Sequence, residues 1–294
     1  MTVLDCGGRA LDLDRCRVMG ILNITPDSFS DGGDFFCLDD ALSRARELVS
    51  AGAAIIDIGG ESTRPGAAAV SDEEEIRRVV PVVEAVHAEL PVPISIDTSK
   101  AEVMRAAVGA GAGMINDVRA LRESGALQAA AELGVPVCLM HMQGEPRSMQ
   151  NAPHYDDVVT EVKAFLLERV AACEQAGIDR RTLLLDPGFG FGKDLNHNLL
   201  LLNGLAELVD IGLPVVTGVS RKSMIGKILG KEVDQRLYGS IALAALATWQ
   251  GSVLIRAHDV QATVDAIRVI DAVRAAREYN QGPLSAERAV NCGS

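Results

Sequence analysis

The chain has 294 residues, of which 48% are hydrophobic and 23% charged, so it can bury the core of one large α/β domain or two small ones. Its formal net charge of −12 argues against general binding to nucleic acid or to an anionic membrane surface. Its apolar runs all fall well short of the roughly 18 residues that a membrane-spanning helix needs. The six cysteines show neither a C-x-x-C pair nor metal-ligand spacing, which predicts a reduced, cytoplasmic protein.

Short apolar runs alternate with helical patterns along the whole chain after a hairpin expected over residues 1–17. The expected strands are residues 18–22, 54–56, 94–96, 114–115, 135–140, 183–185, 214–219 and 252–255. The expected helices are residues 38–51, a helix beginning near 71, 101–109, 126–133, 155–176, 198–209, 235–250 and 262–277. Ser71 can cap the second helix in a capping box with Glu74. We expect residues 73–75, three glutamates, to form a solvated first turn favoured by the helix dipole.

Strands that alternate with helices are typical of parallel strands joined by crossover helices. Eight such units in a chain of this length favour a closed (β/α)₈ TIM barrel over an open sheet. The N-terminal β-hairpin is expected to cover the bottom of the barrel. Residues 1–277 would then form a single barrel domain, and residues 278–294 a polar C-terminal tail.

Every expected strand ends on a polar or charged side chain, where a barrel without a site would need none. These residues are Asn23, Asp57, Asp97, Asn116, His141, Asp186, Lys222 and Arg256. The carboxyl ends of the strands form the active face of a (β/α)₈ barrel, so we expect these side chains to face one site. Asp57 is as compatible with orienting Arg64 or a loop as with touching a substrate.

The strand-end groups separate into two kinds of chemistry. Asp97, Asn116 and Asp186 supply acceptors and Lys222 a donor, which suits the N–H, NH₂ and carbonyl edge of a guanine-like or pterin-like ring. The second group is cationic and suits a phosphate or pyrophosphate. It comprises Arg64, Arg221, Arg256 and His258, with hydroxyl donors from Ser62, Thr63 and Ser223. Ser223 is also expected to open a short helix, whose N-terminal N–H groups attract anions.

Three other interpretations stay open at this point. The alternating Gly and Phe of residues 188–193 could cradle a phosphate, although the Walker spacing is missing, or could present Phe191 as an aromatic wall. Lys222 could form a Schiff base, although Asp186 and Asn116 as neighbours would keep it protonated. His141 is expected to be a hydrogen-bonded strand-end histidine rather than a zinc ligand.

Five motifs, taken together, resemble the dihydropteroate synthase family of the folate pathway, which sulfonamides inhibit. They are residues 20–33 (GILNITPDSFSDGG), 57–66 (DIGGESTRPG), 186–193 (DPGFGFGK), 220–223 (SRKS) and 256–259 (RAHD). The resemblance extends over about residues 10–277, and it looks closest to monofunctional bacterial members. It implies a (β/α)₈ pterin-binding barrel, usually a homodimer, that joins 6-hydroxymethyl-7,8-dihydropterin pyrophosphate to p-aminobenzoate and releases pyrophosphate.

The resemblance also implies a role for each matching residue. Asp97, Asn116, Met140, Asp186 and Lys222 would bind the pterin; Thr63, Arg64, Arg256 and His258 the pyrophosphate; Phe29, Pro65, Phe191 and Ser223 the p-aminobenzoate; and Asn23 a Mg²⁺ ion. Asp31, Arg64, Asp97 and Lys222 would carry catalysis, with Asp31 stabilising the cation left when pyrophosphate departs. The partners are therefore small molecules, neither nucleic acid nor membrane. The runner-up is a module that binds methyltetrahydrofolate beside a corrinoid partner.

Overall fold

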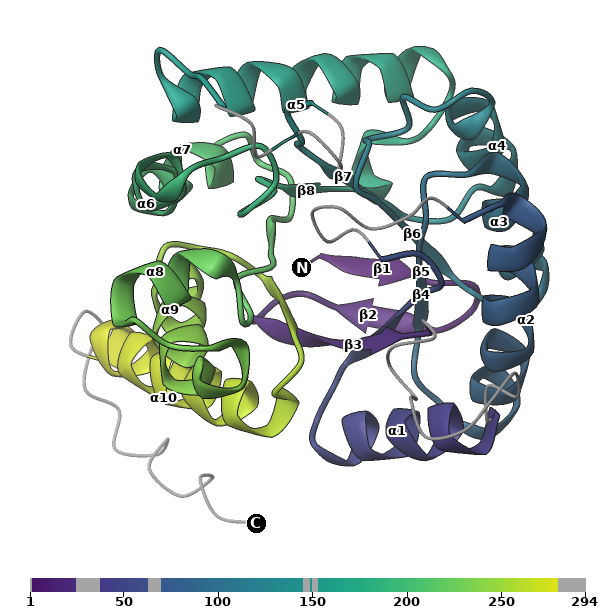
Figure 1. Cartoon of the computed structure of the whole chain (residues 1–294), viewed down its shortest axis with the longest axis horizontal. Helices are drawn as coiled ribbons and strands as arrows, with labels where there is room; N and C mark the ends of the chain where they lie inside the picture. Colours follow the sequence, from purple (N-terminus) through teal and green to yellow (C-terminus); the bar gives the residue numbers. More distant parts are fainter. Residues whose placement is uncertain (1, 25–37, 63–69, 145–148, 150–152, 280–294) are drawn as a thin grey trace.

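The computed structural model describes residues 2–24, 38–62, 70–144, 149 and 153–279. Within this part of the chain, eight parallel strands form one sheet that is nearly closed into a barrel, and helices surround it (Figure 1). The predicted fold class is therefore confirmed. Among the described residues, no helix is long and apolar enough to cross a membrane.

The barrel strands follow each other around the sheet in the order β8-β7-β6-β5-β4-β3-β10-β9. Their bounds are β3 (Arg17–Asn23), β4 (Ile55–Gly59), β5 (Ile94–Asp97), β6 (Met114–Asp117), β7 (Val137–Met140), β8 (Leu183–Asp186), β9 (Val216–Thr217) and β10 (Leu254–Ala257). An isolated parallel bridge between Leu185 and Val215 joins the two ends of this order and closes the barrel. Because a strand that is buried on both faces has a continuous apolar sequence, these strands could be predicted from their apolar runs.

The helices lie close to the predicted ranges. They are α1 (Leu38–Ser50), α2 (Asp72–Glu89), α3 (Ala101–Gly109), α4 (Ala126–Leu133), α5 (Val158–Gln175), α6 (Leu195–Asn203), α7 (Leu205–Val209), α8 (Ser223–Leu229), α9 (Leu237–Trp249) and α10 (Val260–Tyr279). Two short 3₁₀ turns, Arg180–Thr182 and Val233–Gln235, precede β8 and α9. The last helix runs two residues beyond the predicted end of the domain, and residues 280–294 lie outside the described part.

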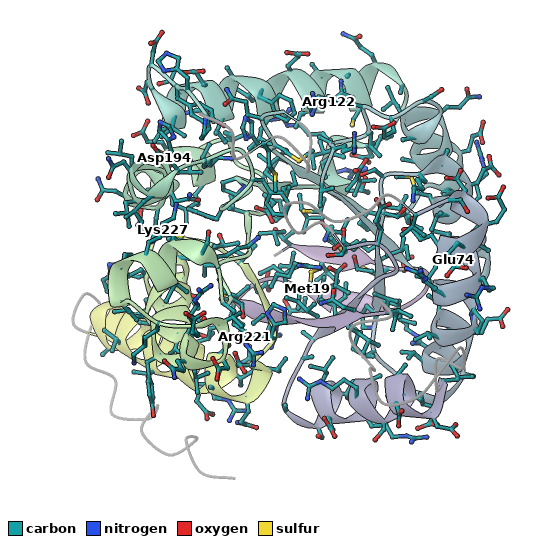
Figure 2. The ribbon with its side chains drawn as sticks, viewed as in Figure 1. Met19, Glu74, Arg122, Asp194, Arg221 and Lys227 are labelled. Atoms are coloured by element: carbon teal, nitrogen blue, oxygen red, sulfur yellow. The ribbon has the colours of Figure 1, made fainter. Side chains whose placement is uncertain are left out.

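The N-terminal hairpin covers the bottom of the barrel, as predicted. Its strands β1 (Val3–Asp5) and β2 (Ala10–Asp12) pair antiparallel. Leu4 and Leu11 of the hairpin pack against side chains from the first half of the barrel strands, among them Met19 and Leu184. Met19 is fully buried and lies in the middle of the molecule (Figure 2). A site is therefore expected at the opposite end of the barrel, its mouth, where the carboxyl ends of the strands lie.

Three expectations need correction. The helix predicted over residues 198–209 is two helices that meet at Gly204, where a Cβ atom would lie 2.8 Å from Val159 Cγ2 of α5. The strand predicted over 214–219 is paired as a strand only at Val216–Thr217. Glu75 belongs to the first turn of α2 but is fully buried rather than solvated, because it pairs with Lys100. Ser71 does cap that helix, accepting from the Glu74 N–H.

Candidate active site

The parallel strands β5 to β8 carry four of the predicted pterin residues at their carboxyl ends, with Met140 and Asp186 two residues further along the register than Asp97 and Asn116. Asp97 pairs with Asn116 across β5 and β6, and Met140 pairs with Asp186 across β7 and β8. Asn23 pairs with Gly59, which in turn pairs with Asp97. Because parallel strands place their carboxyl ends at one edge, side chains far apart in sequence meet there.

Arg256 lies at the centre of a buried polar network at this mouth. Its Nε donates to Asp57 Oδ2 at 2.6 Å, and its Nη2 donates to Asp97 Oδ2 at 2.7 Å. The Asn116 amide donates to the same Asp57 oxygen at 3.1 Å. Asp57 is fully buried, so it orients Arg256 and Asn116 from below. The second oxygen of Asp57, Oδ1, is buried and has no hydrogen-bond partner among the described residues, so a contact with a substrate stays a prediction.

The charges of the mouth shift each other's pKa values. Burial raises the pKa of Asp97 to about 7, although Arg256 opposes this change. Burial and the charge of Arg256 lower the pKa of Lys222 to about 8. Burial also raises the pKa of Asp186, against the opposing effects of the Gly188 N–H and Lys222. Groups with pKa values near neutrality in a concave site are typical of a catalytic or binding centre.

The glycine loop behind Asp186 is fixed by a buried lysine. The Lys193 ammonium donates to the carbonyls of Gly188 at 2.9 Å and Phe191 at 3.1 Å, and its Nζ lies 2.8 Å from His141 Nδ1. Burial lowers the pKa of Lys193 to about 7 and that of His141 to about 2. His141 is therefore a hydrogen-bonded structural residue, as predicted, and Lys193 faces the protein rather than a phosphate.

Left-handed backbone explains the glycines of this loop. Gly188, Gly190 and Gly192 have φ values of 70°, 80° and 61°, a region that favours glycine. A Cβ atom at Gly188 would lie 1.8 Å from the His141 carbonyl oxygen, so only glycine fits there. The repeated glycines thus serve a tight turn over β7, and the phosphate-cradle interpretation has no support from this geometry.

Phe191 faces the site from this loop. It packs with Met140 in a small apolar cluster that also contains Val118, Met142 and Met149. The Lys222 ammonium lies 4.1 Å from the centre of the Phe191 ring, a cation–π contact. Phe191 therefore supports the predicted pterin lysine and extends the apolar wall that Met140 begins.

The turn that carries Lys222 is strained and held from three sides. Arg221 has a φ of 57°, which is unusual for a residue other than glycine. Its guanidinium pairs with Asp259 at 2.6 Å, its N–H donates to Ser240, and its carbonyl accepts from Arg236. Strain of this kind persists at functional sites where the surroundings enforce it. Arg221 was predicted to belong to the cationic group that suits a phosphate, but in the structure its guanidinium pairs with Asp259 and stabilises the turn.

His258 and Ser223 also belong to the described part of the predicted cationic group, as does Ser62. The His258 ring nitrogen lies 3.0 Å from the Ser220 hydroxyl, and burial with Arg256 nearby lowers the pKa of the ring to about 3. His258 is therefore neutral at pH 7 and offers hydrogen bonds rather than charge. Ser223 is the exposed first residue of α8, the short helix predicted there.

Asn23 ends β3 at the mouth and is partly exposed. Among the described residues, no group of three or more His, Cys, Asp or Glu side chains could hold a metal ion. The remaining predicted site residues lie outside the described residues, so the structure assigns them no place. These are Phe29, Asp31, Thr63, Arg64 and Pro65.

Sequence reasoning did not identify Lys193 as a buried anchor or Lys100 as a partner of Glu75. The only signal was their position, because Lys193 ends the motif of residues 186–193 and Lys100 follows the strand-end residue Asp97 by three residues.

A (β/α)₈ barrel whose mouth collects buried acceptors, a lysine and a paired arginine belongs to the class of pterin-binding enzymes. The family model described as "Pterin binding enzyme" matches residues 19–258. Within this class the chain belongs to the dihydropteroate synthase family.

Relatives of known sequence and structure support that membership. The chain is 58% identical to the dihydropteroate synthase of Escherichia coli K12 over 271 residues, which are 92% of this chain and 96% of that one. It is 54% identical to the Haemophilus influenzae enzyme, over 90% of this chain and 97% of that one. The dihydropteroate synthase of Xanthomonas albilineans with 4-aminobenzoic acid superposes with a TM-score of 0.89 at 57% identity, covering 93% of this chain and 98% of that one. The same enzyme in complex with 7,8-dihydropteroate gives a TM-score of 0.86 at 55% identity, over 93% and 99% of the two chains.

Proposed function

We propose that this chain joins 6-hydroxymethyl-7,8-dihydropterin pyrophosphate to p-aminobenzoate, forming 7,8-dihydropteroate and pyrophosphate. The observation that carries the proposal is the convergence of Asp97, Asn116, Asp186 and Lys222 with Arg256 at one barrel mouth. The Xanthomonas albilineans relative named above, whose structures contain 4-aminobenzoic acid and 7,8-dihydropteroate, supports the same substrates.

In the proposed reaction, the C–O bond between the pterin methylene and pyrophosphate breaks first, and pyrophosphate leaves with the electron pair. The dihydropterin ring delocalises the positive charge left on the methylene. The carboxylates of Asp97, which is partly buried, and of Asp186, which is buried, would stabilise that charge, because a low-dielectric site strengthens electrostatic attraction. Arg256 would bind the departing pyrophosphate, together with Arg64 and Thr63, and His258 would donate a hydrogen bond to it.

The amine nitrogen of p-aminobenzoate then attacks the methylene to form the C–N bond, and the protonated amine that results releases its extra proton to the solvent. An uncharged aromatic amine is nucleophilic without a strong base. This agrees with the described site, where neither His141 nor His258 is placed to deprotonate a nucleophile, since both are engaged in structural hydrogen bonds. Phe191 and Ser223 would line the side from which the amine approaches, and Phe29 and Pro65 would complete that surface.

A Mg²⁺ ion is part of the proposal, with the Asn23 amide oxygen as its protein ligand. Mg²⁺ commonly keeps several waters and binds through few protein groups plus substrate phosphates, so one amide at the mouth fits an ion brought with pyrophosphate. The ion would neutralise the charge of the leaving group. Asn23, Arg256 and the strand-end carboxylates would orient the substrate around it.

The proposed molecule is a homodimer of the cytoplasm. Helices α8, α9 and α10 lie together on one side of the barrel (Figure 1) and expose large apolar side chains. These include Ile228, Leu229, Tyr238, Leu246, Trp249, Val269 and Val273. Exposed apolar side chains that cluster on neighbouring helices commonly mark a protein interface. The four described cysteines are buried as free thiols, which suits the predicted reducing compartment.

A corrinoid-linked methyltetrahydrofolate module is not favoured, because relatives at 54–58% identity over nearly the whole chain are synthases. The deciding experiment is an assay of pyrophosphate release with both substrates and Mg²⁺. We expect release that requires p-aminobenzoate and is abolished by chelating the metal. Release that does not depend on p-aminobenzoate would exclude the synthase reaction.

A further inference from the structure

The turn that follows β6, residues 117–121, has a strained backbone. Ala120 and Leu121 have φ values of 53° and 57°, a region that residues other than glycine rarely adopt. Two neighbours in this region are rarer still, because it is normally adopted by single residues. Both side chains are buried in the main apolar core. Contacts with the surrounding structure must therefore stabilise this conformation.

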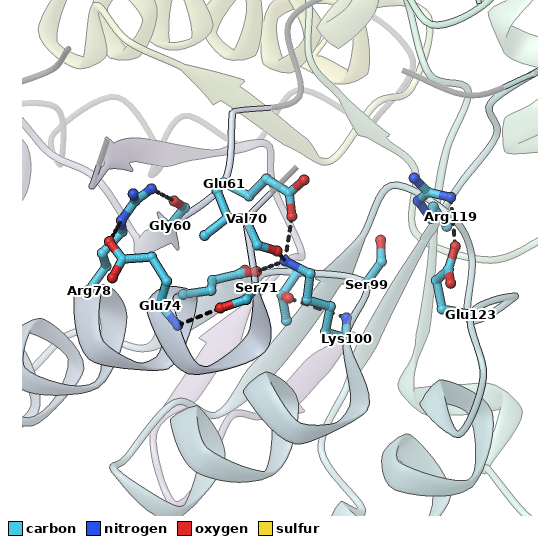
Figure 3. Close-up of polar contacts among 12 residues, drawn as sticks. Gly60, Glu61, Val70, Ser71, Glu74, Arg78, Ser99, Lys100, Arg119 and Glu123 are labelled. Atoms are coloured by element: carbon cyan, nitrogen blue, oxygen red, sulfur yellow. Dashed lines mark hydrogen bonds and ion pairs between the residues drawn. The ribbon is translucent and has the colours of Figure 1, made fainter. Parts of the chain in front are cut away.

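Asp117 stabilises the turn from the end of β6. Its fully buried carboxylate accepts hydrogen bonds from the N–H groups of Arg119 and Leu121, each at 2.7 Å. The hydroxyl of Ser99, which follows β5, donates to the same carboxylate. The Arg119 guanidinium pairs with Glu123 at 2.6 Å, which connects the turn to the segment before α4 (Figure 3). The N–H groups of the turn are thus held by Asp117.

Arg169 of α5 stabilises the same turn from outside the barrel strands. Its Nε donates to the Ala120 carbonyl at 2.9 Å, and its Nη2 donates to the Leu121 carbonyl at 3.4 Å. Both strained residues therefore donate their conformation's exposed acceptor to one guanidinium. Because a guanidinium presents its N–H donors in a rigid, planar fork, it fixes the orientation of the two carbonyls relative to each other.

Two groups of the predicted pterin site depend on this turn. Asn116, a predicted pterin ligand, directly precedes Asp117 in β6. Val118 lies in the turn and packs with Met140 and Phe191 in the apolar cluster beside the site. A movement of the turn would therefore displace both a hydrogen-bonding group and part of the apolar wall.

We infer that Arg169 is a positioning residue for pterin binding, because it holds the strained turn that places Asn116 and Val118 at the barrel mouth. Arg169 acts through the backbone of residues 120 and 121. The inference rests on the proposed function, since that function makes the pterin the ligand of this site.

The test measures the affinity for 6-hydroxymethyl-7,8-dihydropterin by calorimetry and, separately, the affinity for inorganic pyrophosphate in the presence of Mg²⁺. We expect Arg169→Met to weaken pterin binding about tenfold, an effect typical of residues that act through others. Pyrophosphate binding should be unchanged, because Arg256 is held by Asp57 and Asp97. An equal loss of pterin and pyrophosphate affinity, or no loss of either, overturns the inference.

Arg180→Met is the matched control. Arg180 also pairs with α5, through Glu174 at 3.4 Å, but it lies directly before β8, at the end of the barrel opposite the mouth. This variant should change neither affinity. A loss of pterin affinity as large as that in Arg169→Met would show that any weakened contact with α5 has this effect, which contradicts a specific role for Arg169.

A second substitution separates positioning from a general loss of stability. Glycine adopts positive φ values without strain, so Ala120→Gly should make the turn less dependent on Arg169. We expect the double variant Arg169→Met, Ala120→Gly to recover most of the pterin affinity that Arg169→Met loses. A contact that only stabilised the whole fold would not be replaced in this way, so the absence of recovery counts against positioning.

Arg169→Lys serves if Arg169→Met does not fold. Lysine keeps the charge but replaces the two nitrogens that hold the two carbonyls by one. We expect Arg169→Lys to bind the pterin less tightly than wild type, with pyrophosphate affinity unchanged, and Ala120→Gly to restore the pterin affinity. Wild-type pterin affinity in Arg169→Lys, or a loss that Ala120→Gly does not restore, would exclude the role of Arg169.

Turnover by the wild-type protein distinguishes the two proposals. If pyrophosphate release requires p-aminobenzoate but the Arg169 variants bind the pterin normally, the synthase reaction stands and the role of Arg169 falls. If the wild-type protein shows no such release, the synthase reaction falls, while pterin binding by the wild type and the variants still decides the role of Arg169.

Discussion

The guanidinium of Arg256 donates to the carboxylate of Asp97 at 2.7 Å, so a residue predicted to bind pyrophosphate and one predicted to bind the pterin are bonded to each other. The two halves of the substrate are therefore expected to bind to one continuous polar network. A phosphate that draws Arg256 toward itself changes the charge that Asp97 experiences. Asp57 accepts a hydrogen bond from the same guanidinium at 2.6 Å, which limits how far Arg256 can move.

Replacing Asp186 by Asn should weaken pterin binding. The carboxylate is buried at the mouth, and an amide cannot accept from the ring N–H and NH₂ groups with the help of a charge. We expect a loss of about 1.5–3 kcal/mol in binding free energy, measured by calorimetry. Asp210→Asn, at the exposed end of α7, is the control. Unchanged affinity for the pterin would remove Asp186 from direct contact with it.

Pterin affinity should fall as the pH rises through about 8. Burial and the charge of Arg256 lower the pKa of Lys222 to about 8, so the folded protein loses this ammonium donor above that pH. An arginine stays protonated throughout this range, so Lys222→Arg should bind less tightly than wild type at pH 7 and show a flatter pH profile. Titrations between pH 6.5 and about 9.5 in both proteins provide the measurement. Parallel profiles would show that another group causes the change.

Lys193→Met should destabilise the fold and slow turnover. The variant leaves two buried carbonyls, of Gly188 and Phe191, without their donor, and each such loss costs about 1–3 kcal/mol. We expect the free energy of unfolding in urea to fall by about 2–4 kcal/mol. Lys231→Met, at an exposed lysine, should have no effect. If stability were unchanged, the loop would owe its shape to the glycines and Asn198 alone.

Asp31→Ala should lower turnover far more than pterin affinity. Asp31 lies outside the described residues, and its role is a prediction from the motif of residues 20–33. A carboxylate that stabilises only the cation formed on departure of pyrophosphate contributes to the transition state and little to substrate binding. Steady-state kinetics combined with calorimetry separate these effects. A loss confined to affinity contradicts the catalytic role.

Leu246→Glu should convert the proposed dimer to a monomer. Leu246 is 50% exposed on α9 within the apolar surface of the last three helices, and a buried unpaired charge there would be costly. Leu200→Glu is the matched control, because Leu200 on α6 is 57% exposed but lies outside that surface. Sedimentation of both variants beside wild type gives the oligomeric state. A wild-type monomer would contradict the dimer directly.

Much of the fold could be predicted because the strands are buried on both faces and end in polar residues. The level of Asp97 and Asn116 follows from the rule that parallel strands end at one edge, and their register confirms it. The break between α6 and α7 could not be predicted, since it depends on Val159 of α5 meeting Gly204. Local sequence carries no record of such a contact.

The positions of some charged residues of the site could be predicted from the sequence, and those of others could not. Lys222 lies in the turn that follows β9, and Arg256 is the residue before the last of β10, so their place at the mouth followed from topology. Lys193 and Glu75 also carry charge, yet they are buried by partners from other elements, His141 and Lys100. Which side of a loop or helix a charge faces is decided by those partners. A pattern along one segment cannot reveal them.

The barrel has a weak seam between β8 and β9. Only the bridge between Leu185 and Val215 joins these strands among the described residues, next to a Leu185 N–H bond to the Pro214 carbonyl at 2.9 Å. Asp186 ends β8 on one side of this seam, and Lys222 lies in the turn after β9 on the other side. A pterin bound by both residues would connect β8 to the turn after β9 for as long as it stays bound. Binding of the pterin should therefore slow amide hydrogen exchange in β8 and β9. The ligand would then stabilise the part of the barrel where strand pairing is weakest.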